Sequence, residues 1–292
     1  MKTRTLGPYR IERRLATGGM AEVFVAQRLG PHGFQKRVAI KCILPQHARD
    51  SDFVSMFIDE ARLAAQLEHP GIVQVFDFGE AEGSLFLAME FVDGTNVNRL
   101  LRSVAVHRES VPIASALHIG AEAARALAYA HHACDDDGKP LSIVHRDVSP
   151  ANLLLTKRGH VKLSDFGIAR CAQSDHRTDD GHVRGKLGYM SPEQVSGYAI
   201  DGRSDVFTLG TVIAEMLIGE PLFGTGTDLD VLLRIRNADL TVLDRKGRAV
   251  PQDVRAVLAA ALAKHPEERL EAGALAEGLE DLLRRRGAIG RG

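Results

Sequence analysis

The feature that most constrains the fold is a change of hydrophobic pattern near residue 93. Before it, apolar residues alternate with polar ones and Val, Ile and Phe are frequent, which is typical of strands. After it, apolar residues recur at helical spacing. Asp93, Gly94 and Thr95 mark the change, because such residues commonly interrupt regular elements. The pattern predicts an α+β protein with two lobes and a cleft between them.

The first half is expected to hold five strands and one helix. The strands are predicted at residues 9–16, 21–27, 37–44, 72–78 and 84–92. The helix is predicted at 53–67, where Phe57, Ala61, Ala64 and Leu67 fall at helical spacing. The second half is expected to be mainly helical, with helices at 113–133, 204–218, 228–236, 253–263 and 272–284.

Charge and cysteine content exclude several classes of protein. Lys and Arg number 37 and Asp and Glu 38, a net charge of −1 that argues against a nucleic-acid-binding surface. Cys42, Cys134 and Cys171 are far apart and odd in number, which favours free thiols in a reducing cytosol. The longest apolar run, near 208–218, is too short to span a bilayer and contains Glu215.

These observations predict a cytoplasmic chain. The first eight residues lack the apolar core of a signal peptide. Residues 285–292 form a basic, glycine-rich tail, which is expected either to fray or to lie beside a membrane in a longer protein. In the second case the domain would lie on the cytoplasmic side of that membrane.

Two stretches of the first half suit phosphate binding. Gly18 and Gly19 lie between two predicted strands and, lacking a Cβ, allow a close approach of the backbone to phosphate, although a plain hairpin turn has the same pattern. Lys41 follows Val38, Ala39 and Ile40 on an apolar strand, and Glu60 comes 19 residues later on the predicted helix. A partly buried Lys41–Glu60 pair would fix the ammonium toward the phosphates of a nucleotide. A solvated surface lysine is the simpler alternative.

The second half holds three residues suited to phosphoryl transfer. Asp147 and Asn152 belong to the stretch H-R-D-V-S-P-A-N, and Asp165 begins D-F-G. Asn152 and Asp165 carry the oxygen atoms that Mg²⁺ prefers. Asp147 would accept the proton of an attacking hydroxyl. Catalysis of phosphoryl transfer is mostly positioning and charge neutralisation, and these residue types supply both.

Taken together, these motifs resemble the protein kinase family, and their wording resembles bacterial serine/threonine kinases in particular. They are the glycine-rich loop, V-A-I-K, a helical glutamate, H-R-D…N, D-F-G and S-P-E at 191–193. The resemblance covers residues 9–284, with the small lobe and hinge at 9–92 and the large lobe at 93–284. It implies a small five-stranded β lobe with one helix and a larger, mainly helical lobe.

The resemblance also implies an activity and its participants. The chain would transfer the γ-phosphoryl of ATP, with Mg²⁺ or Mn²⁺, to Ser or Thr hydroxyls of proteins, and would autophosphorylate through a transient homodimer. Asp147, Lys41 and Glu60 would be catalytic, and Asn152 and Asp165 would bind the metal. The implied nucleotide-binding residues are Leu15, Ala16, Gly18, Gly19, Ala21, Val23, Ala39, Lys41, Met89, Glu90, Val92 and Leu154.

Further roles follow from the same resemblance. Met89 matches the gatekeeper and residues 90–92 the hinge that holds adenine. Asp205 resembles the helical aspartate that braces the H-R-D backbone. Arg269 resembles the partner of Glu193.

The sequence departs from the family pattern at two positions that are neighbours in the family fold. Ser149 stands where serine/threonine kinases usually have a lysine that contacts the γ-phosphate, and Lys186 stands where they usually have threonine. We hypothesise a reciprocal swap in which Lys186 supplies the charge and Ser149 the hydroxyl. The alternative is that Lys186 points to solvent. A third departure, alanine at positions 16 and 21 of the glycine-rich loop, leaves room for phosphate.

The segment 165–193 is expected to regulate activity. Arg146 precedes the catalytic aspartate, where the family often uses arginine to bind a phosphate on this segment. Thr178, and less favourably Ser174, are the candidate acceptors. Asp179 and Asp180 could instead imitate a phosphate, and a segment of solvated charges without a regulatory role is the third interpretation.

Other classes of function remain open at this stage. A pseudokinase would bind nucleotide without turnover, and only Ser149 favours it. A small-molecule phosphotransferase is disfavoured by S-P-E and Arg269, and a scaffold protein would leave all the motifs without a role. Pro150 and Tyr189 stand where tyrosine kinases typically differ, which favours Ser/Thr specificity.

Overall fold

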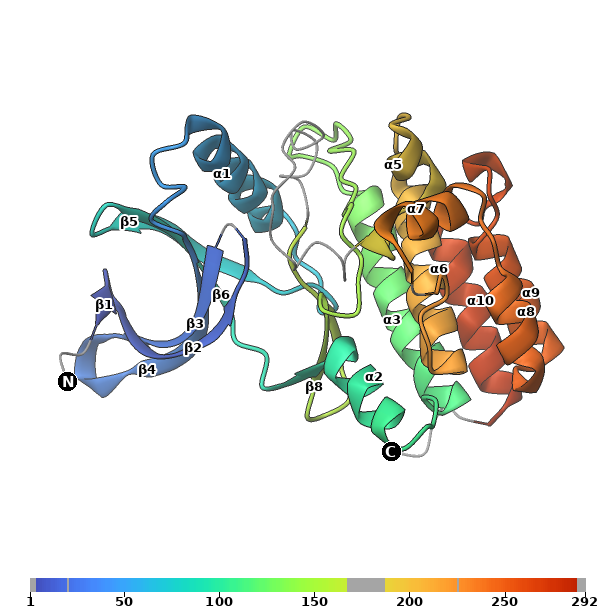
Figure 1. Ribbon diagram of the computed structural model, residues 1–292. Coiled ribbons are helices and arrows are strands. Elements are labelled where there is room, and N and C mark those ends of the chain that lie inside the picture. Colours follow the sequence, from blue (N-terminus) through green and yellow to red (C-terminus); the bar gives the residue numbers. More distant parts are fainter. Residues whose placement is uncertain (1–3, 20, 167–186, 225, 288–292) are drawn as a thin grey trace. The chain divides into compact units, whose positions relative to one another are not determined.

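The computed structural model describes residues 4–19, 21–166, 187–224 and 226–287, and these residues form two compact units (Figure 1). The described residues up to Asp93 make the first unit, and those from Gly94 onward make the second. Within the part of the chain that is described, no helix is both long and apolar enough to cross a membrane.

The first unit is built on an antiparallel sheet with the strand order β1-β2-β3-β4-β6-β5. The strands are β1 Thr5–Leu6, β2 Tyr9–Thr17, β3 Ala21–Leu29, β4 Gln35–Ile43, β5 Val75–Ala81 and β6 Ser84–Glu90. Five of them correspond to the predicted strands, and the sheet gains a sixth, the short edge strand β1. The strand predicted at 72–78 begins three residues later, because Ile72 still belongs to a turn in which its N–H bonds the carbonyl of His69.

One helix, α1 Ser51–Ala65, accompanies this sheet. It begins two residues earlier than predicted, since the Asp50 side chain accepts hydrogen bonds from the N–H groups of Asp52 and Phe53 and so caps the helix. Its buried face carries Phe57 and Ala61, which pack with Ile43 of β4 and Leu87 of β6. A short 3₁₀ turn, Pro31–Gly33, joins β3 to β4.

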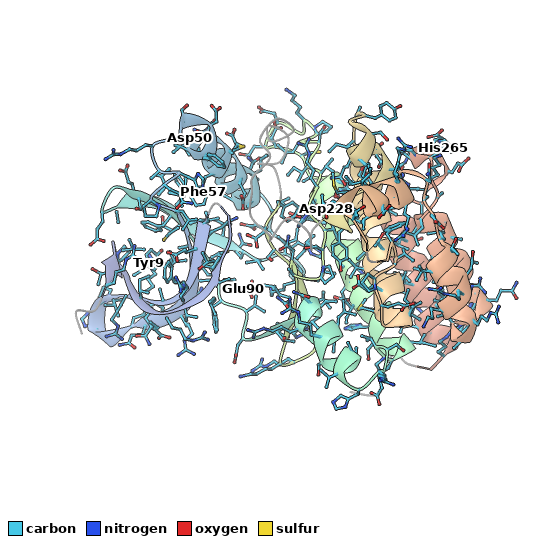
Figure 2. All side chains as sticks on the ribbon, in the orientation of Figure 1. Tyr9, Asp50, Phe57, Glu90, Asp228 and His265 are labelled. Carbon is cyan, nitrogen blue, oxygen red and sulfur yellow. The ribbon has the colours of Figure 1, made fainter. Side chains whose placement is uncertain are left out.

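The other face of the sheet is closed by an aromatic core around Tyr9 (Figure 2). Tyr9 is fully buried, meets the Phe86 ring edge-on at 5.6 Å, and donates its hydroxyl hydrogen to Asp77 at 2.9 Å. Burial and the neighbouring Asp77 carboxylate raise the pKa of Tyr9 to about 12, so the phenol stays protonated as a donor. Strand β4 is thereby held from both faces, and this strand carries Lys41.

The second unit packs its helices around α6 Gly202–Ile218, which is almost completely buried, and α3 Ile113–His131, which is buried along one side (Figure 1). The other helices are α2 Val97–Val106, α5 Pro192–Ser196, α7 Asp228–Arg236, α8 Thr241–Lys246, α9 Gln252–Ala261 and α10 Ala272–Arg285, with 3₁₀ turns at Gly247–Ala249 and Pro266–Glu268. Helix α2 was not predicted, although Val97, Leu100, Leu101 and Val104 recur at helical spacing; of its residues only Val97 is buried.

A small sheet, β7-β8-β9, completes the second unit. Its strands are β7 Gly94–Asn96, β8 Leu153–Thr156 and β9 Val161–Leu163. A Cβ on Gly94 would lie 1.8 Å from the Leu155 carbonyl oxygen, so only glycine permits this pairing. The loop 145–152 runs directly into β8, and Asp165 of D-F-G lies two residues after the end of β9, so the sheet holds one end of each segment.

Candidate active site

In the first unit, the hairpin between β2 and β3 carries the glycine-rich loop. The Gly18 N–H bonds the carbonyl of Ala21 at 2.8 Å, and His47 Nε2 lies 3.0 Å from the Gly19 carbonyl oxygen. No atom lies within 4 Å of the point where a Cβ on Gly19 would stand. Leu15 and Ala16 are exposed, whereas Ala21 is buried. The hairpin therefore presents open backbone at Gly19.

The structure brings Lys41 and Glu60 together in the same unit. Lys41 Nζ lies 2.5 Å from Glu60 Oε1, and the two side chains are 15% and 11% exposed. Val23 and Leu87 flank Lys41 in the sheet. A charge pair this well sheltered is screened much less than a surface pair, so it fixes the direction of the ammonium group.

The residues predicted to contact adenine come from both units. Ala39 and Met89 are buried and pair directly across β4 and β6. Glu90 anchors the start of the predicted hinge, since its N–H bonds the Gln74 carbonyl at 2.8 Å. Val92 is partly buried. Leu154, partly buried, belongs to the second unit and pairs with Asn96 and Lys162 in the small sheet.

In the second unit, the loop 145–152, called the catalytic loop below, is hydrogen-bonded at its start to the buried carboxylate of Asp205, which lies in the first turn of α6. Asp205 Oδ2 accepts the N–H of His145 and Oδ1 accepts the N–H of Arg146, both at 2.8 Å. His131 Nε2, from α3, lies 2.8 Å from Oδ2. Asp205 is 1% exposed. Three donors from two other segments therefore converge on one charge, which fixes the backbone just before Asp147.

His145 is fully buried beside this carboxylate, and its hydrogen bonds define its tautomer. Its Nδ1 accepts the N–H of Asp147 at 3.2 Å, and its Nε2 faces the carbonyl oxygen of Ser164 at 3.1 Å. Because an amide only donates and a carbonyl only accepts, the ring is neutral with its hydrogen on Nε2. Burial lowers the pKa of His145, against the pull of Asp205 and Asp147, and keeps it neutral. The ring also packs on Phe166 at 4.5 Å.

Asp147, Asn152 and Asp165 are brought into one cluster. The Asn152 amide nitrogen donates to the backbone oxygen of Asp147 at 2.8 Å and to its Oδ2 at 3.1 Å. The Ser164 hydroxyl lies 3.3 Å from the Asn152 carbonyl and 3.4 Å from Asp165 Oδ2. Asp165 has a φ of +57°, a left-handed conformation that costs a non-glycine residue energy and that directs its carboxylate.

This donor set fits a hard divalent cation. The amide nitrogen of Asn152 is used in two hydrogen bonds, which leaves its amide oxygen as the atom that could ligate a metal. Asp165 adds a carboxylate. Mg²⁺ is usually held by one or two such protein oxygens together with phosphate and water, not by a full protein cage. The described residues contain no cluster of three or more His, Cys, Asp or Glu side chains that could hold a metal ion.

Ser149 is 3% exposed, and its hydroxyl has no hydrogen-bond partner among the described residues. An unsatisfied buried hydroxyl is uncommon, since it loses its hydrogen bonds to water without replacement. Lys186, its predicted counterpart, lies outside the described residues, as do Ser174, Thr178, Asp179 and Asp180.

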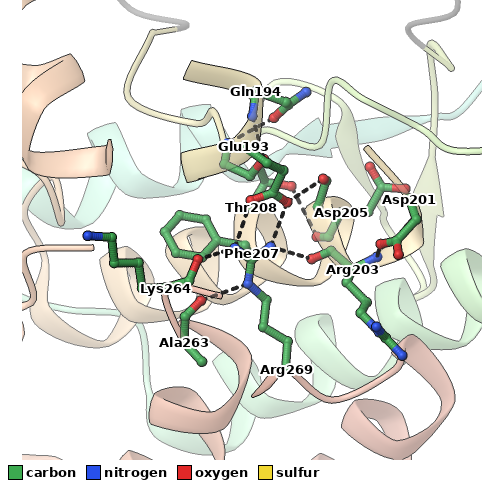
Figure 3. Close-up of polar contacts among 12 residues, drawn as sticks. Glu193, Gln194, Asp201, Arg203, Asp205, Phe207, Thr208, Ala263, Lys264 and Arg269 are labelled. Atoms are coloured by element: carbon green, nitrogen blue, oxygen red, sulfur yellow. Dashed lines mark hydrogen bonds and ion pairs between the residues drawn. The ribbon is translucent and has the colours of Figure 1, made fainter. Parts of the chain in front are cut away.

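The S-P-E segment is anchored by a buried ion pair between Glu193 and Arg269 (Figure 3). Arg269 Nη1 and Nη2 lie 2.6 and 2.8 Å from the two Glu193 oxygens. The remaining guanidinium hydrogens bond the carbonyls of Ala263, Arg203 and Lys264, so all five N–H groups are used. Burial alone would raise the pKa of Glu193, but hydrogen bonds from Arg269 and Ser204 outweigh it and lower the pKa.

Three residues of this region were not among the predicted site residues. His131 shares Asp205 with the catalytic loop, Gln194 bonds the Arg146 carbonyl, and Glu215 accepts the Tyr189 hydroxyl hydrogen at 2.6 Å. Burial raises the pKa of Glu215 despite that bond. Only Glu215 could have been found from the sequence, because it is the lone carboxylate in the longest apolar run, 208–218. His131 and Gln194 act through contacts 74 and 48 residues away, which spacing does not reveal.

Comparison with known proteins agrees with this geometry. The protein kinase domain family matches residues 9–278. The chain is 43% identical over 278 residues to the tyrosine-protein kinase MasK of Myxococcus xanthus, covering 95% of this chain and 43% of that protein. It is 38% identical over 269 residues to the serine/threonine-protein kinase PknJ of Mycobacterium tuberculosis, covering 89% and 43%.

Other similarities lead to the same family. The serine/threonine-protein kinase PknB of Mycolicibacterium smegmatis is 39% identical over 284 residues, covering 94% of this chain and 42% of that protein. The crystal structure of the Mycobacterium tuberculosis PknI kinase domain superposes with a TM-score of 0.67 at 29% identity, covering 96% and 98%. This chain thus spans less than half the length of the curated relatives that it matches.

The Glu193–Arg269 pair predicts a pH dependence of stability. A carboxyl whose pKa is lowered by folding stabilises the protein above its unfolded pKa, about 4.5 here, and the stabilisation is lost as pH falls through the folded pKa. Glu193→Gln should therefore lower the free energy of unfolding by about 3 kcal/mol or more at pH 7. The difference from wild type should shrink below about pH 4.5.

Urea unfolding at several pH values measures this difference. Glu271→Gln is the matched control, because the Glu271 side chain is 64% exposed. A Glu193→Gln protein as stable as wild type at pH 7, or a difference that does not change with pH, contradicts the assignment.

Proposed function

We propose, from the premise that this chain belongs to the protein kinase family, that it transfers the γ-phosphoryl group of ATP to serine or threonine hydroxyls of proteins. The observation that carries the proposal is the cluster of Asp147, Asn152 and Asp165, organised on the buried Asp205. The domain proposed to act is residues 9–284.

Within this proposal the residues have distinct tasks. Asp147 accepts the proton of the attacking hydroxyl, and the Asn152 amide holds the Asp147 carboxylate in place at 3.1 Å. Asn152 and Asp165 would hold Mg²⁺, which when bound neutralises charge on the phosphates. Lys41, aimed by Glu60, binds phosphate oxygens, and the hairpin that carries Gly18 and Gly19, with its open backbone at Gly19, lies over them.

The adenine-binding residues are proposed on the same basis. Ala39 and Met89 supply buried apolar surface, and the chain from Glu90 to Val92 offers backbone groups to the base. Leu15, Ala16, Ala21 and Val23 border the nucleotide from the hairpin side, and Leu154 contributes from the small sheet.

Serine and threonine are the proposed acceptors, although one relative is named a tyrosine kinase. PknJ and PknB are named serine/threonine kinases, at 38–39% identity. Pro150 and Tyr189 stand at positions where tyrosine kinases typically differ. The Pro150 carbonyl accepts the Asn98 N–H at 2.9 Å. The Tyr189 side chain is turned to Glu215 in α6. Because the chain spans under half of these relatives, its protein substrates and its location in the cell are part of the proposal.

A pseudokinase is the second candidate, and one observation favours it. Ser149 replaces the usual lysine, and its buried hydroxyl has no partner among the described residues. Loss of a charge-stabilising donor can cost about 3–4 kcal/mol of barrier. Against this stands the retention of Lys41, Glu60, Asp147, Asn152 and Asp165, each of which a non-catalytic protein could lose.

Asp147→Asn separates the two candidates. Loss of the general base should reduce phosphoryl transfer about 10²- to 10⁴-fold while ATP affinity with Mg²⁺ stays close to wild type. The assay is radiolabel transfer from γ-labelled ATP to a generic protein substrate and to the chain itself, followed by phosphoamino acid analysis. Label should appear on serine and threonine.

The matched control is Asp136→Asn, an exposed aspartate in the loop after α3. Wild type without activity but with bound ATP would establish the pseudokinase. Label confined to tyrosine would overturn the acceptor class and leave the kinase activity standing.

We further propose that Lys186 and Ser149 have exchanged the roles of lysine and hydroxyl in the family pattern. The unpartnered hydroxyl of Ser149 supports this, because it needs a polar group that the described residues do not provide. In the exchange Lys186 brings its ammonium to the transferred phosphoryl and Ser149 takes the bracing hydroxyl.

Lys186→Met should then lower kcat about 10²-fold or more, with a small change in ATP affinity. The double variant Ser149→Lys, Lys186→Thr should recover much of that loss, since both single changes break one coupled pair. Steady-state kinetics of wild type, Ser149→Lys, Lys186→Thr and the double variant gives the coupling, and Lys139→Met, at an exposed position, is the control for Lys186→Met. Additive effects, or normal turnover of Lys186→Met, would refute the exchange.

A further inference from the structure

We infer that Gln194 is a positioning residue that connects the S-P-E segment to the catalytic aspartate through a single side-chain amide. The inference rests on the proposed kinase function and adds a residue that the family motifs do not assign. All of the contacts that carry it lie within the second unit.

Gln194 uses both ends of its amide. Its Oε1 accepts the N–H of Ser191 at 2.8 Å, and its backbone N–H is accepted by the Ser191 hydroxyl at 3.3 Å, which closes a capping box at the start of α5. Its Nε2 donates to the carbonyl oxygen of Arg146 at 3.1 Å. The acceptor end thus belongs to the helix cap and the donor end to the catalytic loop.

The bond to Arg146 falls on the peptide that sets the direction of Asp147. That peptide joins the Arg146 carbonyl to the Asp147 N–H, and the N–H is held by His145 Nδ1 at 3.2 Å. With Gln194 on the carbonyl, the peptide plane is fixed at both ends. The Asp147 Cα is bonded directly to this peptide. A rotation of the peptide plane would therefore move the Asp147 carboxylate.

The backbone at Arg146 is strained, so hydrogen bonds from other segments are needed to keep its conformation. Arg146 has a φ of +65°, a left-handed conformation that costs a non-glycine residue energy. Its N–H is held by Asp205 on one side and its carbonyl by Gln194 on the other. Relaxation of Arg146 to an ordinary conformation would break both bonds, so each bond helps to keep the strained geometry.

Helix α5 is firm enough to serve as the anchor for this hold. Glu193, next to Gln194, is bound to the buried Arg269 and to the Ser204 hydroxyl. The helix ends at Gly197 in a left-handed cap, and the Tyr198 N–H bonds back to the Glu193 carbonyl at 2.9 Å. Gln194 therefore transmits the position of the S-P-E segment to the proposed catalytic base.

Gln194→Glu isolates the connecting bond. Glutamate still accepts the Ser191 N–H, as in the common Ser-x-x-Glu capping box, but a carboxylate cannot donate to Arg146. We expect kcat to fall at least about tenfold, while KM for ATP and the thermal unfolding midpoint stay near wild type. Hydrogen–deuterium exchange of the peptide spanning residues 143–149 should become faster.

Two further variants complete the experiment. Gln252→Glu makes the same chemical change at an exposed position in the first turn of α9 and should alter none of these readouts. Gln194→Met, which loses cap and connection together, should slow turnover as much and also lower the unfolding midpoint.

The outcomes distinguish this inference from the proposed function. If wild type transfers phosphoryl groups and Gln194→Glu matches it in kcat and in exchange, the inference is wrong and the kinase activity stands. If wild type is inactive, the proposed function fails, and the exchange comparison alone decides whether Gln194 holds the loop.

Discussion

The catalytic half of the molecule depends on one buried carboxylate. Asp205 is almost completely withdrawn from water, which would be costly for an unpaired charge. Three donors, the N–H groups of His145 and Arg146 and the ring nitrogen of His131, compensate that cost. Its place in the first turn of α6 adds the favourable end of the helix dipole. Since the carboxylate gains this stabilisation only with the loop in place, it selects the loop conformation that carries Asp147.

The buried ion pair of Glu193 and Arg269 plays a similar part, because it also holds a segment that contacts the catalytic loop. Arg269 uses all five of its N–H groups on Glu193 and three carbonyls and stacks over Phe207 at 4.8 Å. Glu193 thereby holds α5, and Gln194 of that helix reaches the Arg146 carbonyl. Asp147, the proposed base, is thus positioned through polar residues of α5 and α6.

The sequence was sufficient to predict most of the strands and helices whose hydrophobic residues recur with a clear period. Strands such as β3 and helices such as α7 were predicted from their periodicity, and the family resemblance identified Asp205 and Glu193 with their roles. Helix α2 was missed although its apolar residues recur at helical spacing, and the short strands β7 and β9 were missed because three residues do not establish a period. Their stability comes from hydrogen bonds to distant segments, for example the Asn96 side chain to the Ala151 carbonyl. The contacts of Gln194 and His131 and the unpartnered hydroxyl of Ser149 likewise required the three-dimensional arrangement.

The central claim is that the Asp205 carboxylate organises Asp147 for phosphoryl transfer, and Asp205→Asn tests it most directly. The change keeps the shape of the side chain but replaces an acceptor oxygen with an NH₂ group facing N–H donors. The measurement is kcat for transfer from γ-labelled ATP, with Asp201→Asn, a conservative cap exchange at the start of the same helix, as the control. The account predicts a loss of about tenfold or more for Asp205→Asn, with nucleotide affinity retained. Wild-type turnover in a folded Asp205→Asn protein would contradict it.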